Sequence, residues 1–289
     1  MAIVTQAQSQ TANAWFPWVP VAAGLLILYV PTFYGLARTV WQEDDQAHGP
    51  IILAVLLWLF WRHRSVLLAG RGQVAPWSGF ALLVFGLLLY VVGRSQDINL
   101  FQVGSLLPIF VGVLFAMCGW RAVRSLWFPL IFAIFLIPFP AVFIDAVTGP
   151  LKQNVSAVAE TLLYAAGYPI ARSGVVLSVG SYQLLVADDC SGINSMFSLS
   201  ALGLLYLYIM GRKSVLHNAI IVASILPIAF AANIVRVLAL ILVTYHFGDE
   251  AGQGFLHGAA GMVLVMAALI FLLILDGLLA RVIRLPRPA

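Results

Sequence analysis

The chain has 289 residues, of which 62% are hydrophobic and only 9% are charged, and its mean hydropathy is +1.01. A soluble globular protein of this composition would expose very large apolar patches, so the composition excludes that class and indicates a polytopic membrane protein. The formal net charge of +4 does not indicate nucleic-acid binding, because the basic residues stand singly or in pairs at the ends of apolar runs, where they anchor loops.

Apolar runs of about the length that crosses a bilayer, roughly 17–25 residues, recur along the chain. They lie near residues 17–37, 48–62, 77–93, 98–119, 124–143, 191–211, 216–245 and 256–280. The second and third runs are short, so their ends are the least defined. We predict an all-α polytopic membrane protein of about eight transmembrane helices, which forms a single domain over residues 1–289.

Basic and acidic residues alternate between the loops that join these runs. The basic loops contain Arg62, Arg64 and Arg71, then Arg121 and Arg124, then Arg212 and Lys213, and finally Arg281, Arg284 and Arg287. The acidic loops contain Glu43, Asp44 and Asp45, then Asp97, and then Asp249 and Glu250. Because short cytoplasmic loops carry an excess of lysine and arginine, this alternation supports eight spans with both termini in the cytoplasm.

The segment between the fifth and sixth runs is polar enough to lie outside the membrane core. Residues 145–168 have apolar side chains at helical spacing, namely Leu151, Val155, Val158, Leu162 and Leu163. This pattern predicts a short extracytoplasmic amphipathic helix, although a pair of tight extra spans would preserve the same orientation. Residues 174–188 then predict a β-hairpin that turns at Val179-Gly180-Ser181 and leads to the sixth run.

A polar stretch from Ala187 to Met196, which includes Asp188, Asp189 and Cys190, stands at the start of the sixth run. A lone cysteine is more often a packing residue than a nucleophile, but the acids and the following Ser-Gly are not packing residues. A helix N-terminus stabilises a thiolate, whereas the two carboxylates oppose it. Cys190 is therefore a candidate nucleophile, and Asp189 can equally serve as the N-cap of the helix.

Arg236 is a second candidate, since it lies inside the seventh apolar run. A guanidinium in a membrane span costs at least ~2.5–3.5 kcal/mol on insertion scales. Asn233 lies three residues earlier, so it shares the helix face of Arg236 and can support it. A structural ion pair with Asp188 or Asp189 is one explanation. The other is that the guanidinium lowers the pKa of a nearby thiol and binds an oxyanion.

Two histidines compete for the role of general acid and base. His246 lies in an interfacial loop, where a solvated side chain is the simpler explanation. His257 begins the eighth run and is followed by Gly258 and Gly261, which allow another helix to approach closely. We prefer His257, because a cysteine with a histidine is the usual nucleophilic pair near neutral pH. No two of the five histidines are four residues apart, so we predict neither a metal site nor a cofactor.

Three motifs in this order resemble those of the exosortase/archaeosortase family, and in particular its bacterial, exosortase B-like members. They are Asp-Cys-Ser-Gly-Ile-Asn-Ser at 189–195, Asn-Ile-Val-Arg at 233–236 and His-Gly-Ala-Ala-Gly at 257–261. The earlier run Asp-Gln-Ala-His-Gly-Pro at 45–50 is also similar to the family's N-terminal pattern. The resemblance covers about residues 20–280.

The resemblance implies a membrane-embedded cysteine protease-transpeptidase, similar in chemistry to a sortase. Its substrates would be exported membrane-anchored proteins with a C-terminal signal made of a Pro-Glu-Pro type motif, a transmembrane helix and a basic tail. By the same resemblance Cys190 would be the nucleophile, Arg236 the stabiliser of the oxyanion or thiolate, and His257 the acid and base. The family works in the lipid bilayer at the outer, periplasmic face of the inner membrane, often beside exopolysaccharide genes.

Other polar residues of these motifs are candidates for substrate binding or support. They are Asp189, Ser191, Asn194, Asn233 and His48. Some family members carry an extra soluble C-terminal domain, and this chain stops at Ala289 without one. The acceptor step and the need for a separate helper protein as a partner are therefore left open, and nucleic acid is not an expected partner.

Other classes of protein remain as alternatives. A polytopic transporter or flippase would also explain the buried Arg236 and the polar Asn233 and Asn194, but we find no inverted repeat. A non-catalytic subunit of an exopolysaccharide assembly would explain the hydrophobicity without using Cys190. A membrane acyltransferase that forms a thioester is a third alternative.

Overall fold

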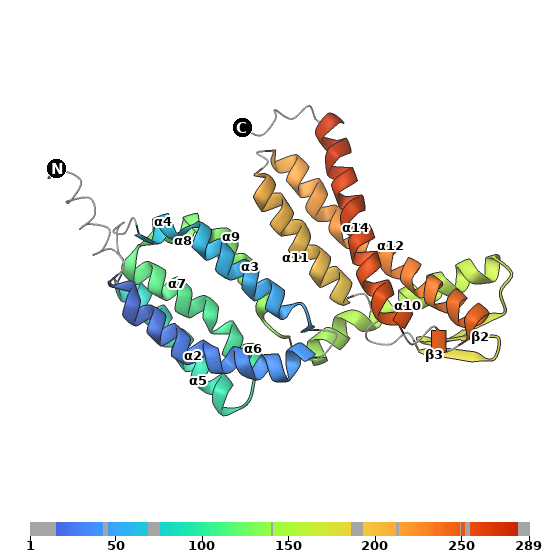
Figure 1. Cartoon of the computed structure of the whole chain (residues 1–289), viewed down its shortest axis with the longest axis horizontal. Coiled ribbons are helices and arrows are strands. Elements are labelled where there is room, and N and C mark those ends of the chain that lie inside the picture. The colour runs from blue at the N-terminus through green and yellow to red at the C-terminus, as the bar shows by residue number, and fades with distance from the viewer. Residues whose placement is uncertain are drawn as a thin grey trace. The chain divides into compact units, whose positions relative to one another are not determined.

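The structure is a computed structural model that describes residues 16–42, 46–68, 76–139, 141–185, 193–211, 214–248, 250–251 and 255–282. Most of these residues form helices, and a small antiparallel sheet follows the middle of the chain (Figure 1). The contacts divide the chain into two compact units, and the boundary in the sequence falls between Pro140 and Ala141. We call them the N-terminal unit and the C-terminal unit and describe each by itself.

The N-terminal unit consists of helices joined by short connections. They are α2 (Trp18–Arg38), η1 (Val40–Gln42), α3 (Gly49–Arg62), α4 (Arg64–Leu68), α5 (Pro76–Ser95), α6 (Asn99–Gly104), α7 (Leu106–Met117), α8 (Trp120–Ser125), α9 (Trp127–Phe132) and η3 (Ala133–Leu136). Glycines bring α5 and α7 together, because a Cβ on Gly79 would lie 2.8 Å from the carbonyl oxygen of Gly112. Such close backbone approach through small residues is typical of helices that pack within a membrane.

Hydrogen bonds between side chains also connect the helices of the N-terminal unit. The hydroxyl groups of Tyr29 on α2 and Ser105, between α6 and α7, lie 2.8 Å apart. Thr32 on α2 and Tyr90 on α5 are joined by a similar hydroxyl pair at 3.0 Å. All four side chains are buried, so these bonds satisfy polar groups that would otherwise lie in an apolar interior.

The fifth predicted run, residues 124–143, is not one continuous helix. α9 passes into η3, which ends at Leu136, and the next helix begins at Ala141. The reason is Pro138, which lacks a backbone N–H and disfavours helical geometry at the residue before it. Ile137 is accordingly extended, with a ψ of 118°.

The C-terminal unit contains four helices and three strands among the residues that the structure describes. They are α10 (Ala141–Ala165), β1 (Ile170–Ser173), β2 (Val176–Val179), β3 (Tyr182–Leu185), α11 (Ile193–Met210), α12 (Val215–Phe247) and α14 (Phe255–Val282). Helices α11, α12 and α14 run side by side and share an apolar cluster (Figure 1). We call it the bundle cluster; its buried members are Leu199, Leu207, Ile221, Ile225, Ala229, Ala268 and Leu272.

The sheet has the order β1-β2-β3, and both pairs of strands are antiparallel. The predicted hairpin is thus confirmed as β2 and β3, whereas β1 was not predicted. Each turn has two residues and begins with a glycine of positive φ, 64° at Gly174 and 58° at Gly180. Glycine adopts this left-handed geometry without strain, and two-residue hairpin turns require it.

Helix α10 confirms that residues 145–168 are largely helical, and it is a single helix rather than two tight spans. Its buried apolar residues follow a spacing of four, at Val155, Ala159 and Leu163. Two residues that we placed on the apolar face, Val158 and Leu162, are instead exposed. The buried stripe of α10 packs on the sheet and on α12.

We call the apolar cluster that α10 forms with the sheet and α12 the sheet cluster. Its buried members are Val155, Ala159, Leu163, Ile170, Leu177, Val179, Val237, Leu240 and Ile241.

The described helices carry the surface of a membrane protein. Four of them are long and apolar enough to cross a bilayer, at Trp18–Arg38, Trp77–Ser95, Asn99–Met117 and Val215–Phe247. Shorter apolar helices are Gly49–Arg62, Trp127–Leu136 and Phe197–Met210. Large apolar side chains are exposed along several of these helices, for example Ile27, Phe80 and Leu226. Lipid is the natural environment for such a surface.

Candidate functional site

The candidate site is built around one face of α12. The buried residues of this helix recur mostly every four residues and form a single stripe. Most are apolar, but the stripe also contains His217, Asn233, Arg236 and Thr244. Asn233 and Arg236 are 3% and 7% exposed. The expected burial of Arg236 is therefore confirmed, and Asn233 lies on the same buried face of the helix.

Asn233 and Arg236 lie between two apolar clusters. Ala229, one turn before Asn233, belongs to the bundle cluster formed with α11 and α14. Val237, directly after Arg236, belongs to the sheet cluster formed with α10 and the sheet. The amide and the guanidinium therefore occupy the point at which α12 passes from one packing environment to the other. Charge-assisted hydrogen bonds are stronger at such an apolar site than in water.

The start of α11 lies near this polar pair. Helix α11 has 18 residues and packs against α12 after a short connection. Counting the same number of residues from the start of α12 reaches Ala232, the neighbour of Asn233. Antiparallel helices joined by a short turn have equal rise per residue. The first residues of α11, Ile193 and Asn194, consequently lie at about the level of Asn233.

Three of the predicted site residues fall outside the described residues. They are Asp189, Cys190 and Ser191, which precede α11. Two further candidates, Asn194 and His257, lie in the first turns of α11 and α14. In these two turns the structure describes the backbone but not the side chains. The roles of these five residues therefore remain predictions.

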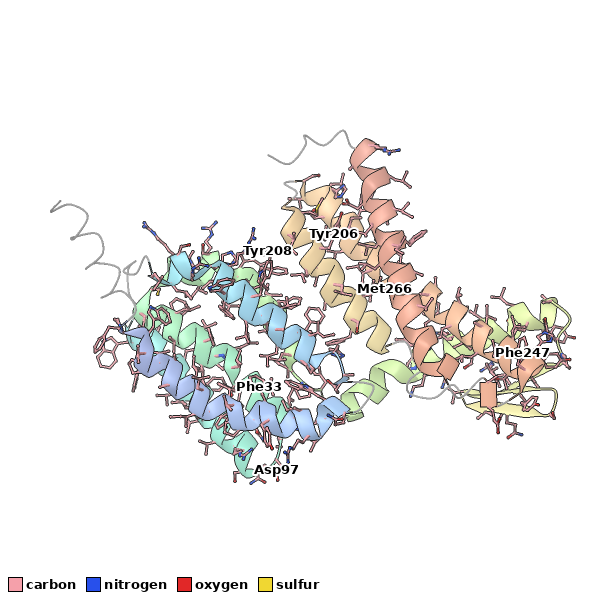
Figure 2. The ribbon with its side chains drawn as sticks, in the orientation of Figure 1. Phe33, Asp97, Tyr206, Tyr208, Phe247 and Met266 are labelled. Atoms are coloured by element: carbon pink, nitrogen blue, oxygen red, sulfur yellow. The ribbon has the colours of Figure 1, made fainter. Side chains whose placement is uncertain are left out.

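His246, the rival of His257, lies in the last turn of α12 and is exposed. Its Nε2 lies 3.3 Å from the hydroxyl oxygen of Tyr168, at the end of α10. The rings of Tyr168 and Tyr245 pack edge to face beside it. His246 is thus helical rather than part of a loop, and it is the exposed member of an aromatic group whose two tyrosines are half-buried against the sheet cluster. Figure 2 labels the neighbouring Phe247 at this end of α12.

His48 belongs to the N-terminal unit, where it directly precedes α3 and is half-buried. The following Gly49 packs tightly on Trp41, since a Cβ at this glycine would overlap the indole ring. The backbone at His48 is therefore held by packing. Its proposed contact with substrate remains a prediction.

A second polar cluster in the C-terminal unit was not predicted. Nε2 of His217 on α12 lies 2.6 Å from Oδ1 of Asp276 on α14. Tyr206 on α11 donates a hydrogen bond of 2.8 Å to Oδ2 of the same carboxylate. Tyr206 lies near the end of α11 that leads into α12 (Figure 2). We call these three residues the helix clamp, because one side chain comes from each of the three packed helices.

A signal for the clamp exists in the sequence. Asp276 is the one carboxylate in α14, where 28 residues are otherwise almost entirely apolar. The argument that singled out Arg236, that a charge inside an apolar run is expensive and has a reason, applies equally to Asp276. It identifies a buried acid, but it does not identify partners on two other helices.

The comparisons with known proteins agree with the motifs. The model of the transmembrane exosortase family, of the EpsH type, matches residues 40–274. This range includes Cys190, Arg236 and His257. Searches of curated proteins and of solved structures returned no match. The resemblance to exosortases is confirmed, and it carries the implication of a multi-pass membrane protein that processes the sorting signals of exported proteins. Since the matched range is well over half of its length, the chain belongs to the transmembrane exosortase family.

Proposed function

We propose that this exosortase is a membrane-embedded cysteine protease-transpeptidase that acts through a thioester on Cys190. Its substrates would be exported, membrane-anchored proteins with a C-terminal Pro-Glu-Pro type sorting signal. Family membership supports the reaction class. The observation that carries the site is the burial of Arg236 beside Asn233, between two apolar clusters. A charge held at this position is expensive and suits a role in binding negative charge.

The proposed reaction divides into two steps. The Cys190 thiolate attacks the scissile carbonyl carbon, and the oxygen becomes an oxyanion that accepts hydrogen bonds from Arg236. His257 then protonates the leaving amine, so that the C–N bond breaks and the thioester remains. In the second step water or an amine attacks the thioester and gives its proton to His257. The thiolate leaves, and the product is an acid or an amide.

The other candidate residues would support this chemistry. Asn233 lies one helical turn before Arg236, from which its amide can orient the guanidinium. Asn194 begins α11 at about the same level, so its amide is a candidate second donor to the oxyanion. Asp189 would cap α11, and Ser191 would supply a hydroxyl beside the thiolate. We assign a substrate contact to His48.

The alternation of charged loops supports an orientation for this site. With both termini in the cytoplasm, the first turns of α11 and α14 and the second half of α12 face the periplasm. The sorting signal of an exported protein reaches the same side, while its transmembrane helix shares the bilayer of the inner membrane. A separate helper protein is a further proposed partner, which would deliver or remove the acceptor.

Processing of a tagged substrate with a Pro-Glu-Pro C-terminal segment tests the proposal in membranes that contain the intact protein. The wild type should cleave it, and intact-mass analysis should detect the acyl-enzyme adduct. Cys190→Ala should abolish both signals, and Cys190→Ser should leave little of either. Cys118→Ser is the matched control, because Cys118 is buried between α7 and α8. If Cys190→Ala still cleaves the substrate, the mechanism through Cys190 is wrong. If the wild type cleaves nothing, a transporter or a non-catalytic assembly subunit becomes the better explanation.

A further inference from the structure

We propose that the helix clamp, Tyr206–His217–Asp276, is a positioning site that fixes the register of α11, α12 and α14. It lies at the opposite end of the three helices from the candidate catalytic residues. Its effect on register follows from the geometry alone, whereas its effect on turnover rests on the proposed function.

The geometry of the clamp ties three helices at one level. Both oxygens of the Asp276 carboxylate are used, one by His217 at 2.6 Å and the other by the Tyr206 hydroxyl at 2.8 Å. His217 and Asp276 are 0% and 2% exposed, so neither side chain can exchange its partner for bulk water. Ser214 caps the start of α12 by accepting a hydrogen bond from the backbone N–H of His217. The backbone that carries the imidazole is therefore held as well.

Apolar packing alone leaves the register of these helices weakly defined. The bundle cluster consists of leucine, isoleucine and alanine side chains, which attract one another without preferred direction. Helix α14 is apolar on all sides, so a rotation or a slip would exchange one apolar contact for another. Any such slip would separate Asp276 from His217 and leave a buried carboxylate and imidazole without their partners. Hydrogen-bonded polar groups therefore select one register, as single buried polar residues do in coiled coils.

Equal counts along two helices connect the clamp with the candidate site. His217 and Arg236 are 19 residues apart on α12, and Asp276 and His257 are 19 residues apart on α14. At 1.5 Å per residue, both distances are roughly 28 Å along the helices. The two helices run antiparallel, so a clamp that pairs His217 with Asp276 also sets the level of His257 relative to Arg236. Pro227 lies between the clamp and Arg236, and the bundle cluster holds α12 against α14 on both sides of this proline.

Cysteine cross-linking measures the register without using activity. In a chain with Cys118→Ser and Cys190→Ser, Ile225→Cys on α12 is combined with either Ala268→Cys or Leu272→Cys on α14. The pairing of His217 with Asp276 places Ile225 level with Ala268. These two positions of α14 are one turn apart in the bundle cluster. Disulfide yields are read by peptide mass spectrometry. In the parent chain one pair should dominate, and in the double variant His217→Leu/Asp276→Leu the preference between the pairs should be lost. An unchanged preference would overturn the proposal.

The double variant is chosen because an apolar pair leaves no uncompensated buried charge and should still fold. Asp276→Asn supplies a second measurement, since its amide can bond both Tyr206 and His217. It should keep the preference of the parent chain. Tyr206→Phe should leave the α12–α14 preference unchanged, because it removes only the tie to α11. Ser224→Ala is the matched control on α12, since the Ser224 hydroxyl donates its hydrogen bond to the carbonyl oxygen of Ile221 within the same helix.

Measurement of turnover completes the test, in chains that retain the native Cys190. A displacement of about 1 Å at a reacting group can lower a rate about 10²-fold, so the double leucine variant should lose about this factor in kcat, with Asp276→Asn rescuing it. Loss of activity with an unchanged cross-linking preference would overturn the positioning role. A changed preference in a chain whose wild type cleaves nothing would instead support the register and refute the proposed function.

Discussion

Arg236 and Asp276 illustrate how a membrane protein uses single buried charges. Each lies on a helix that is mostly apolar, and each is almost fully buried. Since an ionisable group inside a span is costly, it is retained where it binds another group. For Asp276 that partner is visible, because His217 and Tyr206 occupy both carboxylate oxygens. For Arg236 the proposed function adds the reacting oxyanion as a bound group, and this proposal leads to predictions for individual side chains.

Replacing Arg236 should remove most of the activity without unfolding the protein. Arg236→Gln removes the charge, and Arg236→Lys keeps the charge but loses the planar fork of donors. Loss of one oxyanion donor lowers kcat about 10²–10³-fold, so both variants should fall by this factor in the substrate-processing assay. Arg281→Gln is the control, because Arg281 is exposed in the last turn of α14. Full activity in Arg236→Gln would exclude the guanidinium from the reaction.

The two histidines should differ sharply in the same assay. A general acid and base contributes about 10²–10⁴-fold, so His257→Ala should lose this factor. His246→Ala should retain activity within a few fold, because His246 is exposed and contacts Tyr168 on the surface. If His246→Ala loses activity and His257→Ala keeps it, His246 at the end of α12 is the acid and base, and the aromatic group around it is part of the active site.

Single residues also mark the limit of what the sequence predicted. The burial of Arg236 followed from its position in an apolar run, and the structure confirms it. The helix clamp was missed, although Asp276 interrupts its run just as clearly. The physical reason is that the hydropathy of a single run indicates whether a residue lies inside the membrane, but not which other helix its side chain faces. Partners on other helices depend on how those helices are rotated, which no single run reveals.

At the scale of elements, α12 joins two packing environments. Its first half belongs to the bundle cluster and its second half to the sheet cluster. The central strand β2 alternates strictly, with Leu177 and Val179 buried and their neighbours half-buried. The ion pair between Arg172 on β1 and Glu160 on α10, at 2.9 Å, attaches the edge of the sheet to the helix. The sheet therefore supports the half of α12 that carries Arg236.

Loss of packing under the sheet should destabilise this half of the C-terminal unit. Leu177 is fully buried between β2 and the helices, so Leu177→Ala should cost about 2–5 kcal/mol. Gln183→Ala is the matched control, since Gln183 is exposed on β3. Thermal unfolding in detergent should show a lowered midpoint for the first variant and no change for the second. Equal midpoints would mean that the sheet packs less tightly than the structure indicates.

The elements were predicted with unequal success for reasons of local chemistry. The hairpin of β2 and β3 was recognisable because Gly180-Ser181 separates two alternating segments. The strand β1 was missed, since Ile170 is its only buried residue. The apolar face of α10 was misjudged at Val158 and Leu162 because Ala159, a small residue, completes the buried stripe. Short strands and helix faces that contain alanine have few large apolar residues, so their periodicity in the sequence is weak.

At the scale of the whole molecule, the loop charges predict how the chain crosses the membrane. The structure contains helices over all eight predicted runs, although the fifth ends early at Leu136. The number of spans and the side of each loop remain predictions, since they depend on the bilayer. They matter for function, because the sorting signal of an exported protein can reach the first turns of α11 and α14 only if these lie in the periplasm.

Labelling with a membrane-impermeant maleimide tests the orientation in intact cells. In a Cys118→Ser/Cys190→Ser background, Gln96→Cys and Arg64→Cys each place one thiol in a segment that connects two predicted spans, and both native side chains are exposed. The loop after α5 contains Asp97, whereas the loop after α3 contains several arginines. Because arginine-rich loops stay in the cytoplasm, Gln96→Cys should react in intact cells and Arg64→Cys only after permeabilisation. The opposite pattern would put the start of α11 in the cytoplasm, where no exported substrate could reach Cys190, and would contradict the proposed reaction together with the topology.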